Sequence, residues 1–512
     1  MFFLIAALLD LGGLALLIDN HRMEVLPTSS ALMLASAGFA LAGFLRMGFR
    51  DHWLGICFCS YFGVVFPLGG IVFPLFPESM SSLLPVDAAA LSLALLVAGT
   101  GWLCFVLGYL IYNGLLGART RTRLQAFYRS HPCSYSWPLL LALGVAGLPF
   151  RFFVQAFAHS AIGTALAYLG DIPPTLANLG LICTCALGLA PRRAYRFAGM
   201  GVLSIYVVIG LLSGQRGTAF VPALTFASFY LLTAAPRVRL SPSRRVSVKA
   251  VVLIAALIAS VVVSFPVLTR MKMLLMEKRG SVSGTARIGA VADTLQQAYT
   301  NYRDQPIEEK SVSANLLRFH RRLSQLQYAA FLATKGRQEW GMLYGASLLD
   351  SVIVFVPRIL WPDKPGIGLG PRSYQLMVHD ERAVGANTIP VSVDWYLNYD
   401  LIGVVLGMLL IGAFYAMVDA RSSGTNPLGC AFLAFLTYDL MVAGHGISGI
   451  IATVLLHGLP VLLILWLVRR RSAYPSPAVS YGRRPYLRNM FGGRQFSRFG
   501  AAGRAHLLRH GQ

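Results

Sequence analysis

The chain has 512 residues, of which 56% are hydrophobic and only 13% are charged, and its mean hydropathy is +0.61. Soluble domains carry about 25% charged residues, so this composition excludes an ordinary soluble protein and indicates an integral membrane protein. The net charge of +23 raises the alternative of a nucleic-acid-binding protein, which the placement of the charges along the chain decides.

Long apolar runs predict an all-α, polytopic membrane protein with about twelve transmembrane helices. The runs lie at 2–18, 29–46, 53–76, 88–113, 137–157, 175–190, 197–213, 217–234, 250–268, 401–420, 427–444 and 449–468. The first run has Asp10 in its middle and no basic leader, so we expect a retained helix rather than a cleaved signal peptide.

Basic residues concentrate in alternate loops between these runs. One set of loops holds Arg46, Arg50, Arg119, Arg121, Arg123, Arg129, Arg192, Arg193, Arg196, Arg237, Arg239, Arg244, Arg245, Lys249 and Arg421. The other set holds only Arg22, Arg151 and Arg216. Because Lys and Arg are enriched in cytoplasmic loops, we expect both termini in the cytoplasm.

The runs divide the chain into four parts. These are an N-terminal transmembrane bundle at 1–268, a large loop at 269–399, C-terminal transmembrane helices at 400–468 and a basic tail at 469–512. The loop is expected outside the cytoplasm, in the periplasm of a bacterium. The tail has many arginines and no acidic residue, and we expect it to be disordered and to lie on anionic lipid headgroups. The charges therefore do not point to nucleic acid.

Within the loop, the segment 315–336 predicts an amphipathic helix when it is read at 100° per residue. Its apolar arc holds Phe319, Leu323, Leu326 and Ala330. Its adjoining arc holds Arg318, Arg321, Arg322 and Gln325. Three guanidinium groups on one side suit an anion or a headgroup surface. An ordinary solvated face is the alternative.

A second feature of the loop is the apolar run 346–357, which is too short to span a bilayer and predicts a re-entrant or interfacial helix. The stretch "RILWPDKP" follows it, with Arg358 and Lys364 on backbone that two prolines stiffen. Arg372 comes shortly afterwards. This stiff backbone would hold positive charge in a fixed position at the level of a lipid headgroup.

Arg216 is the one charged residue in the short loop "SGQRG" between two predicted spans. Flanking glycines allow a ligand to approach the backbone closely, and an arginine at membrane depth is a functional hypothesis by default. An arginine that snorkels to the interface is the alternative. The sequence contains no Asp-x-Asp pair and no Walker loop, which disfavours metal-bound nucleotide sugars and ATP-driven transport.

The order of these features resembles the Wzy-type oligosaccharide repeat-unit polymerases, also called O-antigen or exopolysaccharide polymerases. The similar pieces are the Gly-x-Arg-Gly turn at 214–217, the large late loop with its basic helix, "PRILWPDKP", and "NTIPVSVDWYLNYDLIGVVLGM" at 387–408. The resemblance covers the architecture of most of the chain, and its specific part lies in the turn and between 340 and 410. It implies a glycosyltransferase-C-like membrane architecture in the bacterial inner membrane.

Such polymerases transfer a growing glycan from undecaprenyl diphosphate to a hydroxyl of a new lipid-linked repeat unit, without a cofactor or a metal. The leaving lipid diphosphate needs electrostatic stabilisation, which arginine supplies well. The candidate diphosphate-binding residues are Arg216, Arg318, Arg321, Arg322, Arg358, Lys364 and Arg372. We expect Arg216 and Arg358 to act in catalysis as well.

The acceptor hydroxyl needs a general base, and Asp394 is the first candidate. His320, His379 and His445 are candidates behind it, and pairing of Asp394 with an arginine is the alternative. Trp395 and Tyr396 could stack on sugar rings, with interface anchoring as their alternative role.

Two other functions compete with the polymerase. An O-antigen ligase or another lipid-linked glycosyltransferase would use the same donor with a different acceptor. A flippase or exporter of lipid-linked glycan is expected to have charges in many spans and internal repeats, and neither pattern is found. The expected partners are the lipid-linked oligosaccharide and membrane lipids, with a polysaccharide chain-length regulator as a further candidate.

Overall fold

The structure is a computed structural model. It describes residues 1–19, 22–49, 51–75, 86–117, 119–123, 133–156, 172–212, 216–234, 286–303, 325–354, 356, 361, 369–378, 389–422, 427–441, 446–459, 463 and 469–471. The regular elements of this part of the chain are helices, apart from two three-residue strands, β1 (Cys133–Tyr135) and β2 (Arg469–Arg471), which pair antiparallel. The expected all-α class is therefore confirmed.

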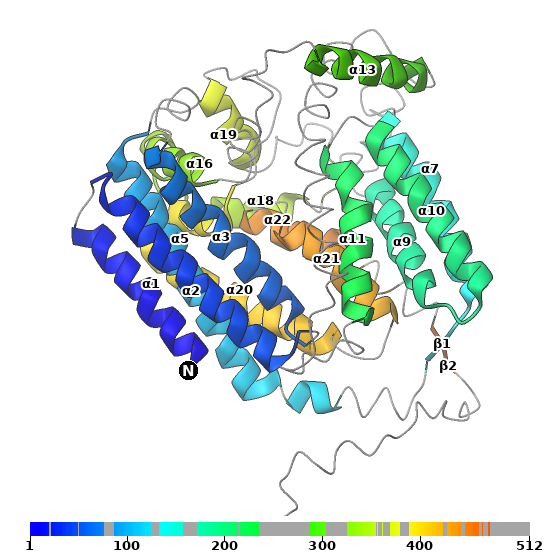
Figure 1. The fold of residues 1–512 in the computed structure, drawn as a ribbon, viewed down its shortest axis with the longest axis horizontal. Helices are drawn as coiled ribbons and strands as arrows, with labels where there is room; N and C mark the ends of the chain where they lie inside the picture. The colour runs from blue at the N-terminus through cyan, green and yellow to red at the C-terminus, as the bar shows by residue number, and fades with distance from the viewer. Residues whose placement is uncertain are drawn as a thin grey trace, which may run out of the picture.

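The long helices form two groups that lie side by side (Figure 1). The first group holds α1 (Phe2–Asp19), α2 (Val25–Gly48), α3 (Trp53–Leu75), α5 (Ala88–Tyr112) with the π-helical η1 (Asn113–Gly117), and α20 (Val391–Ser422). The second group holds α7 (Trp137–Ala156), α9 (Ile172–Ala186) with the 3-10 turn η2 (Leu187–Leu189), α10 (Arg193–Leu212), α11 (Arg216–Ala234) and α21 (Pro427–Met441). Helix α21 joins the groups because it contacts α9 and α11 as well as α3 and α20.

Four helices in the described part are long and apolar enough to cross a membrane: Val25–Gly48, Trp53–Pro74, Ala88–Gly117 and Val391–Ser422. Shorter apolar helices lie at Phe2–Ile18, Trp137–Phe152, Pro173–Leu189, Val221–Thr233 and Leu428–Thr437. These helices confirm a membrane protein with transmembrane helices. The run expected at 250–268 lies outside the described residues, and the count of twelve and the sidedness remain predictions.

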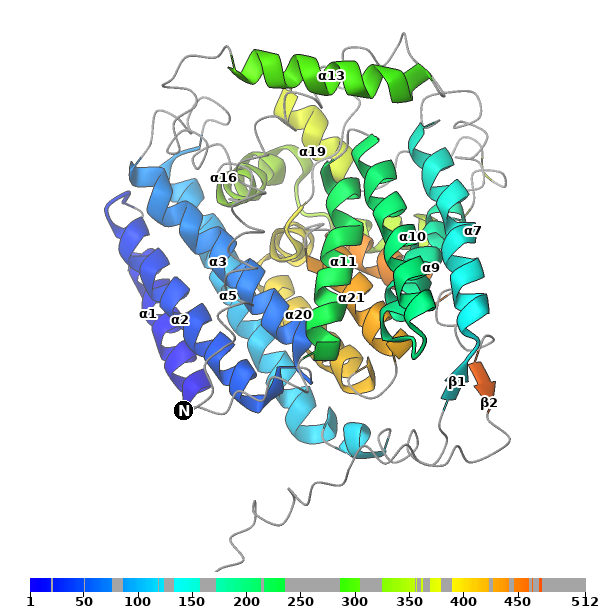
Figure 2. The same cartoon turned by 45° about the vertical axis from the view of Figure 1, so that its right-hand side comes forward.

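The described elements between α11 and α20 lie partly at one end of the bundle. They are α13 (Ala286–Arg303), α16 (Leu326–Phe331), the π-helical η5 (Leu332–Gly336), α17 (Arg337–Trp340), α18 (Ala346–Val354) and α19 (Leu369–Val378). Figure 2 shows α13, α16 and α19 at this end, which we call the loop end. Met1 and the two strands lie at the opposite end, the strand end. The chain returns to the interior through α22 (Ile447–Ala452) and the π-helical η6 (Thr453–Gly458).

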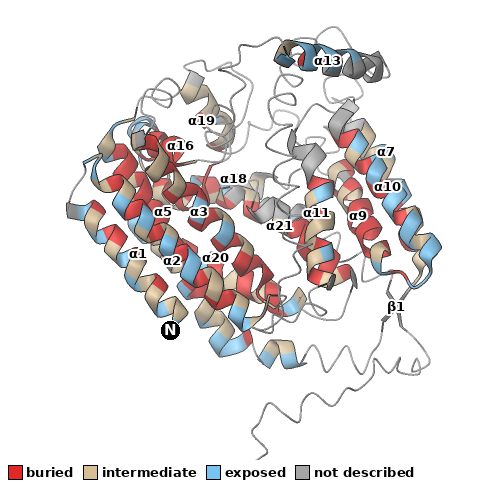
Figure 3. Cartoon of the chain, viewed as in Figure 1, coloured by how far each residue is buried: buried red, intermediate tan, exposed pale blue. Residues whose placement is uncertain are grey.

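The core of the first group lies where α3, α5 and α20 face one another (Figure 3). The rings of Phe58 and Phe105 stack at a centroid distance of 3.8 Å, and Tyr415 meets Phe105 edge-on at 5.4 Å. The outer faces of the helices carry exposed apolar side chains such as Phe197, which is 75% exposed. Apolar side chains on the outside are what a lipid environment requires.

Helices α5 and α20 are in backbone contact. A Cβ atom on Gly108 would lie 2.1 Å from the carbonyl oxygen of Leu409, and one on Gly412 would lie 2.0 Å from that of Phe105. Small residues allow such an approach between membrane helices, where packing replaces the hydrophobic effect as the source of association. This close seam holds α20 in place and so positions the break described next.

Candidate functional site

Helix α20 is interrupted near its N-terminal end. Tyr399 (φ −142, ψ 21) and Asp400 (φ 60, ψ −157) leave the helical conformation. The helix resumes at Leu401, whose amide donates a hydrogen bond to Asp400 Oδ1 at 2.8 Å. Non-helical backbone at membrane depth is tolerated only where protein encloses it or where it lines a cavity. The backbone polar groups at the break therefore need hydrogen-bond partners from elsewhere in the chain.

The partners come from the segment between α17 and α18. The amides of Leu343 and Tyr344 donate to the carbonyls of Leu397 and Asn398 at 3.0 and 3.2 Å. Arg337 Nη1 donates to the carbonyl of Leu397 as well, at 2.9 Å. These carbonyls would accept bonds from amides four residues later in an unbroken helix. A second segment thus satisfies the polar groups that the break exposes.

Backbone strain concentrates at the same place. Tyr344 (φ 48) and Asp400 (φ 60) are the two non-glycine residues with positive φ among the described residues, and they lie on the two segments joined here. Such residues cost roughly 1–3 kcal/mol each and persist where the surroundings fix them. The strain makes this junction the best candidate for a functional site.

Asp394 lies one turn before the break and is 1% exposed. The amide of Ile447 donates to its Oδ2 at 2.6 Å, and Asn398 Nδ2 donates to its Oδ1 at 2.9 Å. A Cβ on Gly446 would lie 2.3 Å from Oδ2, so only glycine allows this approach. Asp394 therefore caps α22, where a carboxylate also complements the helix dipole.

Asn398 connects three segments around this carboxylate. Its Nδ2 also donates to Ser347 Oγ at 2.7 Å and to the carbonyl of Asp394 at 2.8 Å. Its Oδ1 accepts from the amide of Gly345 at 2.9 Å. The result is a buried polar network that ties α20 to α18 and to the start of α22.

A charged pair lies beside the network and is partly open to solvent. Arg337 Nη2 is 3.4 Å from Asp400 Oδ2, and the two side chains are 21% and 49% exposed. The guanidinium also lies 5.7 Å from the ring centroid of Tyr396, a cation–π contact. Two exposed tyrosines flank the pair: Tyr344 is 75% exposed, and Tyr399 is 37% exposed with its hydroxyl over Gly345.

The sequence-predicted residues divide into those near this break and those outside the described residues. Asp394, Trp395 and Tyr396 lie together on the N-terminal segment of α20, and the ring of Trp395 packs against Gly407 beyond the break. Arg372 is exposed on α19. Arg318, Arg321, Arg322, Arg358, Lys364, His320, His379 and His445 lie outside the described residues, as does the side chain of Arg216, which begins α11. The grouping of these cations remains a prediction.

Sequence reasoning missed Arg337, Asn398 and Asp400. The available signal was the polar stretch "LNYD" at 397–400, next to a long apolar run. Their partners are about sixty residues away in the chain, and no periodicity shows such a pairing. No group of three or more His, Cys, Asp or Glu side chains that could hold a metal ion occurs in the described part of the chain.

Comparison with known proteins places this site in a recognised sequence region. A family model described as a domain of unknown function (DUF8712) matches residues 246–473. No curated protein and no solved structure matches the chain. The matched region contains α16 to α22, and thus every element that forms the break in α20.

Proposed function

We propose that the protein is a membrane glycosyltransferase that polymerises undecaprenyl-diphosphate-linked oligosaccharide repeat units. It acts at the periplasmic face of the bacterial inner membrane and transfers the growing chain to a new lipid-linked repeat unit. The proposal rests on the resemblance to Wzy-type polymerases between 340 and 410.

The observation that carries it is the strained break in α20. The break combines a buried carboxylate, Asp394, with a partly open arginine, Arg337, and exposed tyrosines at the end of a membrane-spanning helix. A lipid-linked sugar places its diphosphate and first sugar at this depth. The same end of the bundle carries α13, α16 and α19, three helices of the segment 269–399.

In the proposed reaction the acceptor hydroxyl oxygen attacks the anomeric carbon of the donor glycan. The bond from that carbon to the diphosphate oxygen breaks, the hydroxyl proton passes to a carboxylate, and the lipid diphosphate leaves as an anion. Arg337 supplies a guanidinium that can bind phosphate oxygens bidentately in exchange for Asp400. Arg216, Arg358 and the other predicted cations would add to it.

Two carboxylates are available as the base. Asp394 has both oxygens hydrogen-bonded within the protein and must release one of these bonds to reach a substrate. Asp400 is about half exposed and lies beside Arg337. We retain Asp394 as the first candidate because it is enclosed and held in position, and Asp400 is the alternative.

The experiment uses the purified full chain with a lipid-diphosphate-linked repeat unit as the sole substrate, and products are separated as a ladder on a gel. Arg337→Lys keeps the positive charge but loses the planar guanidinium that can bind bidentately, and we expect at least tenfold less product. Arg216→Ala, Arg358→Ala and Asp394→Asn are expected to lose the ladder. Arg123→Lys, which changes an exposed arginine at the strand end, is the matched control.

Full activity of the folded Arg216, Arg358, Arg337 and Asp394 variants would contradict the proposed site. Transfer to an added lipid acceptor instead of a ladder would indicate a ligase.

A further inference from the structure

Helix α1 lies against the bundle with one face and turns the other face outward. Its buried residues include Ala6, Asp10, Leu14 and Leu17, and its exposed ones include Leu4, Leu8, Leu11 and Ile18. Asp10 is 1% exposed and lies at the middle of the helix, far from either end. It therefore faces α2 and α5, the helices that α1 contacts, rather than lipid.

Two hydroxyl groups of α2 fix α1 on both sides of this carboxylate. Ser36 Oγ donates to the carbonyl of Ala6 at 2.5 Å, and Ser29 Oγ donates to that of Gly13 at 2.7 Å. Interhelical hydrogen bonds of this kind hold membrane helices together. Asp10 is thus held between two anchored turns and cannot move toward water without breaking them.

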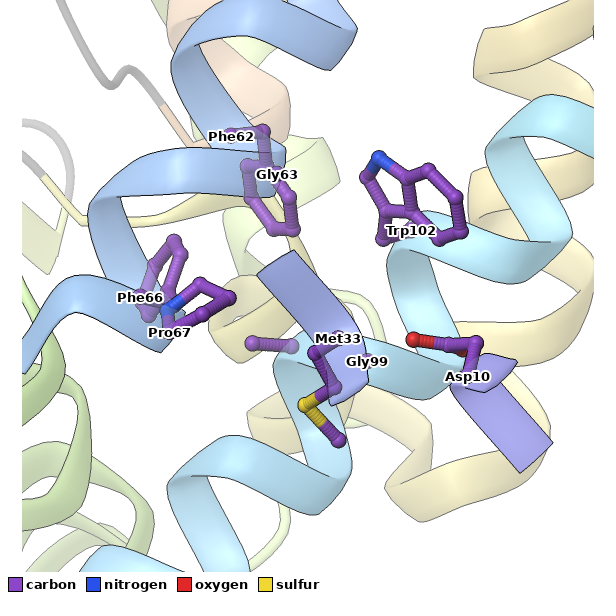
Figure 4. Close-up of a pocket in the computed structure, with 9 residues that line it drawn as sticks. Asp10, Met33, Phe62, Gly63, Phe66, Pro67, Gly99 and Trp102 are labelled. Atoms are coloured by element: carbon purple, nitrogen blue, oxygen red, sulfur yellow. The ribbon is translucent and has the colours of Figure 1, made fainter. Parts of the chain in front are cut away.

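The carboxylate points into a small cavity between α2, α3 and α5 (Figure 4). The cavity has a volume of about 10 Å³, which is the space of one water molecule. Its walls are mainly the apolar side chains of Met33, Phe62, Phe66 and Trp102. Asp10 Oδ2 has no hydrogen-bond partner among the described residues.

One backbone oxygen at the cavity lacks its usual partner as well. Pro67 lies inside α3 and lines the cavity together with Gly63. Proline has no amide hydrogen, so the helical hydrogen bond to the carbonyl four residues earlier, that of Gly63, is missing. The cavity is therefore lined by a carboxylate oxygen and a backbone acceptor, and the indole N–H of Trp102, which has no hydrogen-bond partner in the described part of the chain, is a donor at the same cavity.

An ionised carboxylate here would be an isolated charge within the hydrocarbon layer, which is very costly. No lysine, arginine or histidine is among the described lining residues. The titratable groups nearby are thiols: Cys104 of α5 interacts electrostatically with Asp10, and Cys59 of α3 lies against Trp102. A sodium ion would need a shell of several oxygens, and the cavity offers one carboxylate and one carbonyl.

We propose that Asp10 and its cavity form a proton-binding site, in which the side chain is a neutral carboxylic acid. Its O–H group donates to a water molecule in the cavity or to the Gly63 carbonyl. Loss of the proton to water would leave an unpaired charge between α1, α2 and α5. Protonation of Asp10 is thus the condition for α1 to stay packed, and this site is separate from the break in α20.

The test is infrared spectroscopy of the purified full chain in lipid nanodiscs at neutral pH. We expect a carbonyl stretching band of a protonated carboxylic acid that moves to lower frequency in D2O. Asp10→Asn should remove this band, and Asp10→Glu should move it. The matched control is Asp87→Asn, which replaces an exposed carboxylate that caps α5 and should leave the band unchanged.

Three results would overturn the proposal. They are the absence of an acid band from the wild-type spectrum, a band that stays unchanged in both Asp10 variants, and a band that disappears when sodium chloride is added at constant pH. The last result would assign the site to sodium. The wild-type spectrum decides the first point even where a variant fails to fold.

Discussion

At the scale of single residues, Asn398 has the most connected side chain at the break in α20. It donates to Asp394 and Ser347 and accepts from the amide of Gly345. It is fully buried, so none of these groups can turn to water for a replacement partner. The cost of removing it is the cost of leaving several buried polar groups unpaired.

We therefore expect Asn398→Ala to lower the free energy of unfolding by about 2–4 kcal/mol, because each unsatisfied buried group costs roughly 1–3 kcal/mol. The measurement is thermal unfolding in detergent. Gln338→Ala changes an exposed amide on the nearby helix α17 and should stay within about 0.5 kcal/mol of wild type. Equal stability of the two variants would show that the network is not formed.

At the scale of helices, a second buried polar network joins α3, α5 and α20 at the strand end. The hydroxyl of Tyr109 donates to Asp419 Oδ2 at 2.6 Å, and the amide of Leu54 donates to the same carboxylate at 3.0 Å. His52 Nδ1 lies 3.1 Å from Tyr109 Oη, and Arg121 Nη1 lies 3.3 Å from His52 Nε2. His52 is in the turn between α2 and α3, outside the membrane-spanning segments.

This set of hydrogen bonds makes the free energy of unfolding depend on pH. Burial, together with the nearby Arg121 guanidinium, lowers the pKa of His52 from 6.5 to about 3. The unfolded chain binds the proton near pH 6.5 and the folded chain does not, so the stabilisation is complete above pH 6.5 and is lost as the pH falls toward 3. At pH 5 the loss is about 2 kcal/mol.

We expect the unfolding temperature to fall between pH 7 and pH 5 and to fall less in His52→Gln, which cannot titrate. Thermal unfolding of both proteins in the same detergent at each pH measures this. Parallel curves for the two proteins would mean that His52 is protonated in the folded state.

The glycine seam between α5 and α20 gives an independent prediction at this scale. Gly412→Ala would place a Cβ 2.0 Å from the backbone of Phe105, so the helices must move apart, at a cost of about 1–3 kcal/mol or more. Gly201→Ala, on α10, has nothing within 4 Å and should be neutral or slightly stabilising. Unfolding of both variants in the same detergent compares them, and a Gly412→Ala variant as stable as wild type would contradict the close seam.

At the scale of the whole molecule, hydropathy predicted an all-α membrane protein and many of its helices. The run expected at 401–420 begins where α20 resumes after its break, because Asp394, Asn398 and Asp400 lower the hydropathy of the preceding turns. The helical part before the break, from Val391, was missed for the same reason. The short helix expected from residue 346 is α18. The break itself could not be predicted, since its hydrogen-bond partners come from a distant segment.

The proposed orientation also concerns the whole molecule and can be tested by labelling in intact cells. Tyr344→Cys places a thiol at an exposed position beside the break in α20, and Arg123→Cys places one at the strand end. We expect a membrane-impermeant maleimide to label Tyr344→Cys from the periplasm, and Arg123→Cys only after permeabilisation. The wild-type chain reports the background from its own cysteines, and the reverse pattern would invert the proposed topology.

One reconstitution decides whether the chain joins lipid-linked repeat units. The wild-type protein is placed in liposomes with a lipid-diphosphate-linked repeat unit, and both product length and the leaflet that holds the substrate are measured. We expect a ladder of products that remain attached to lipid diphosphate. Substrate that crosses the bilayer without any gain in length would contradict this expectation and would identify a transporter.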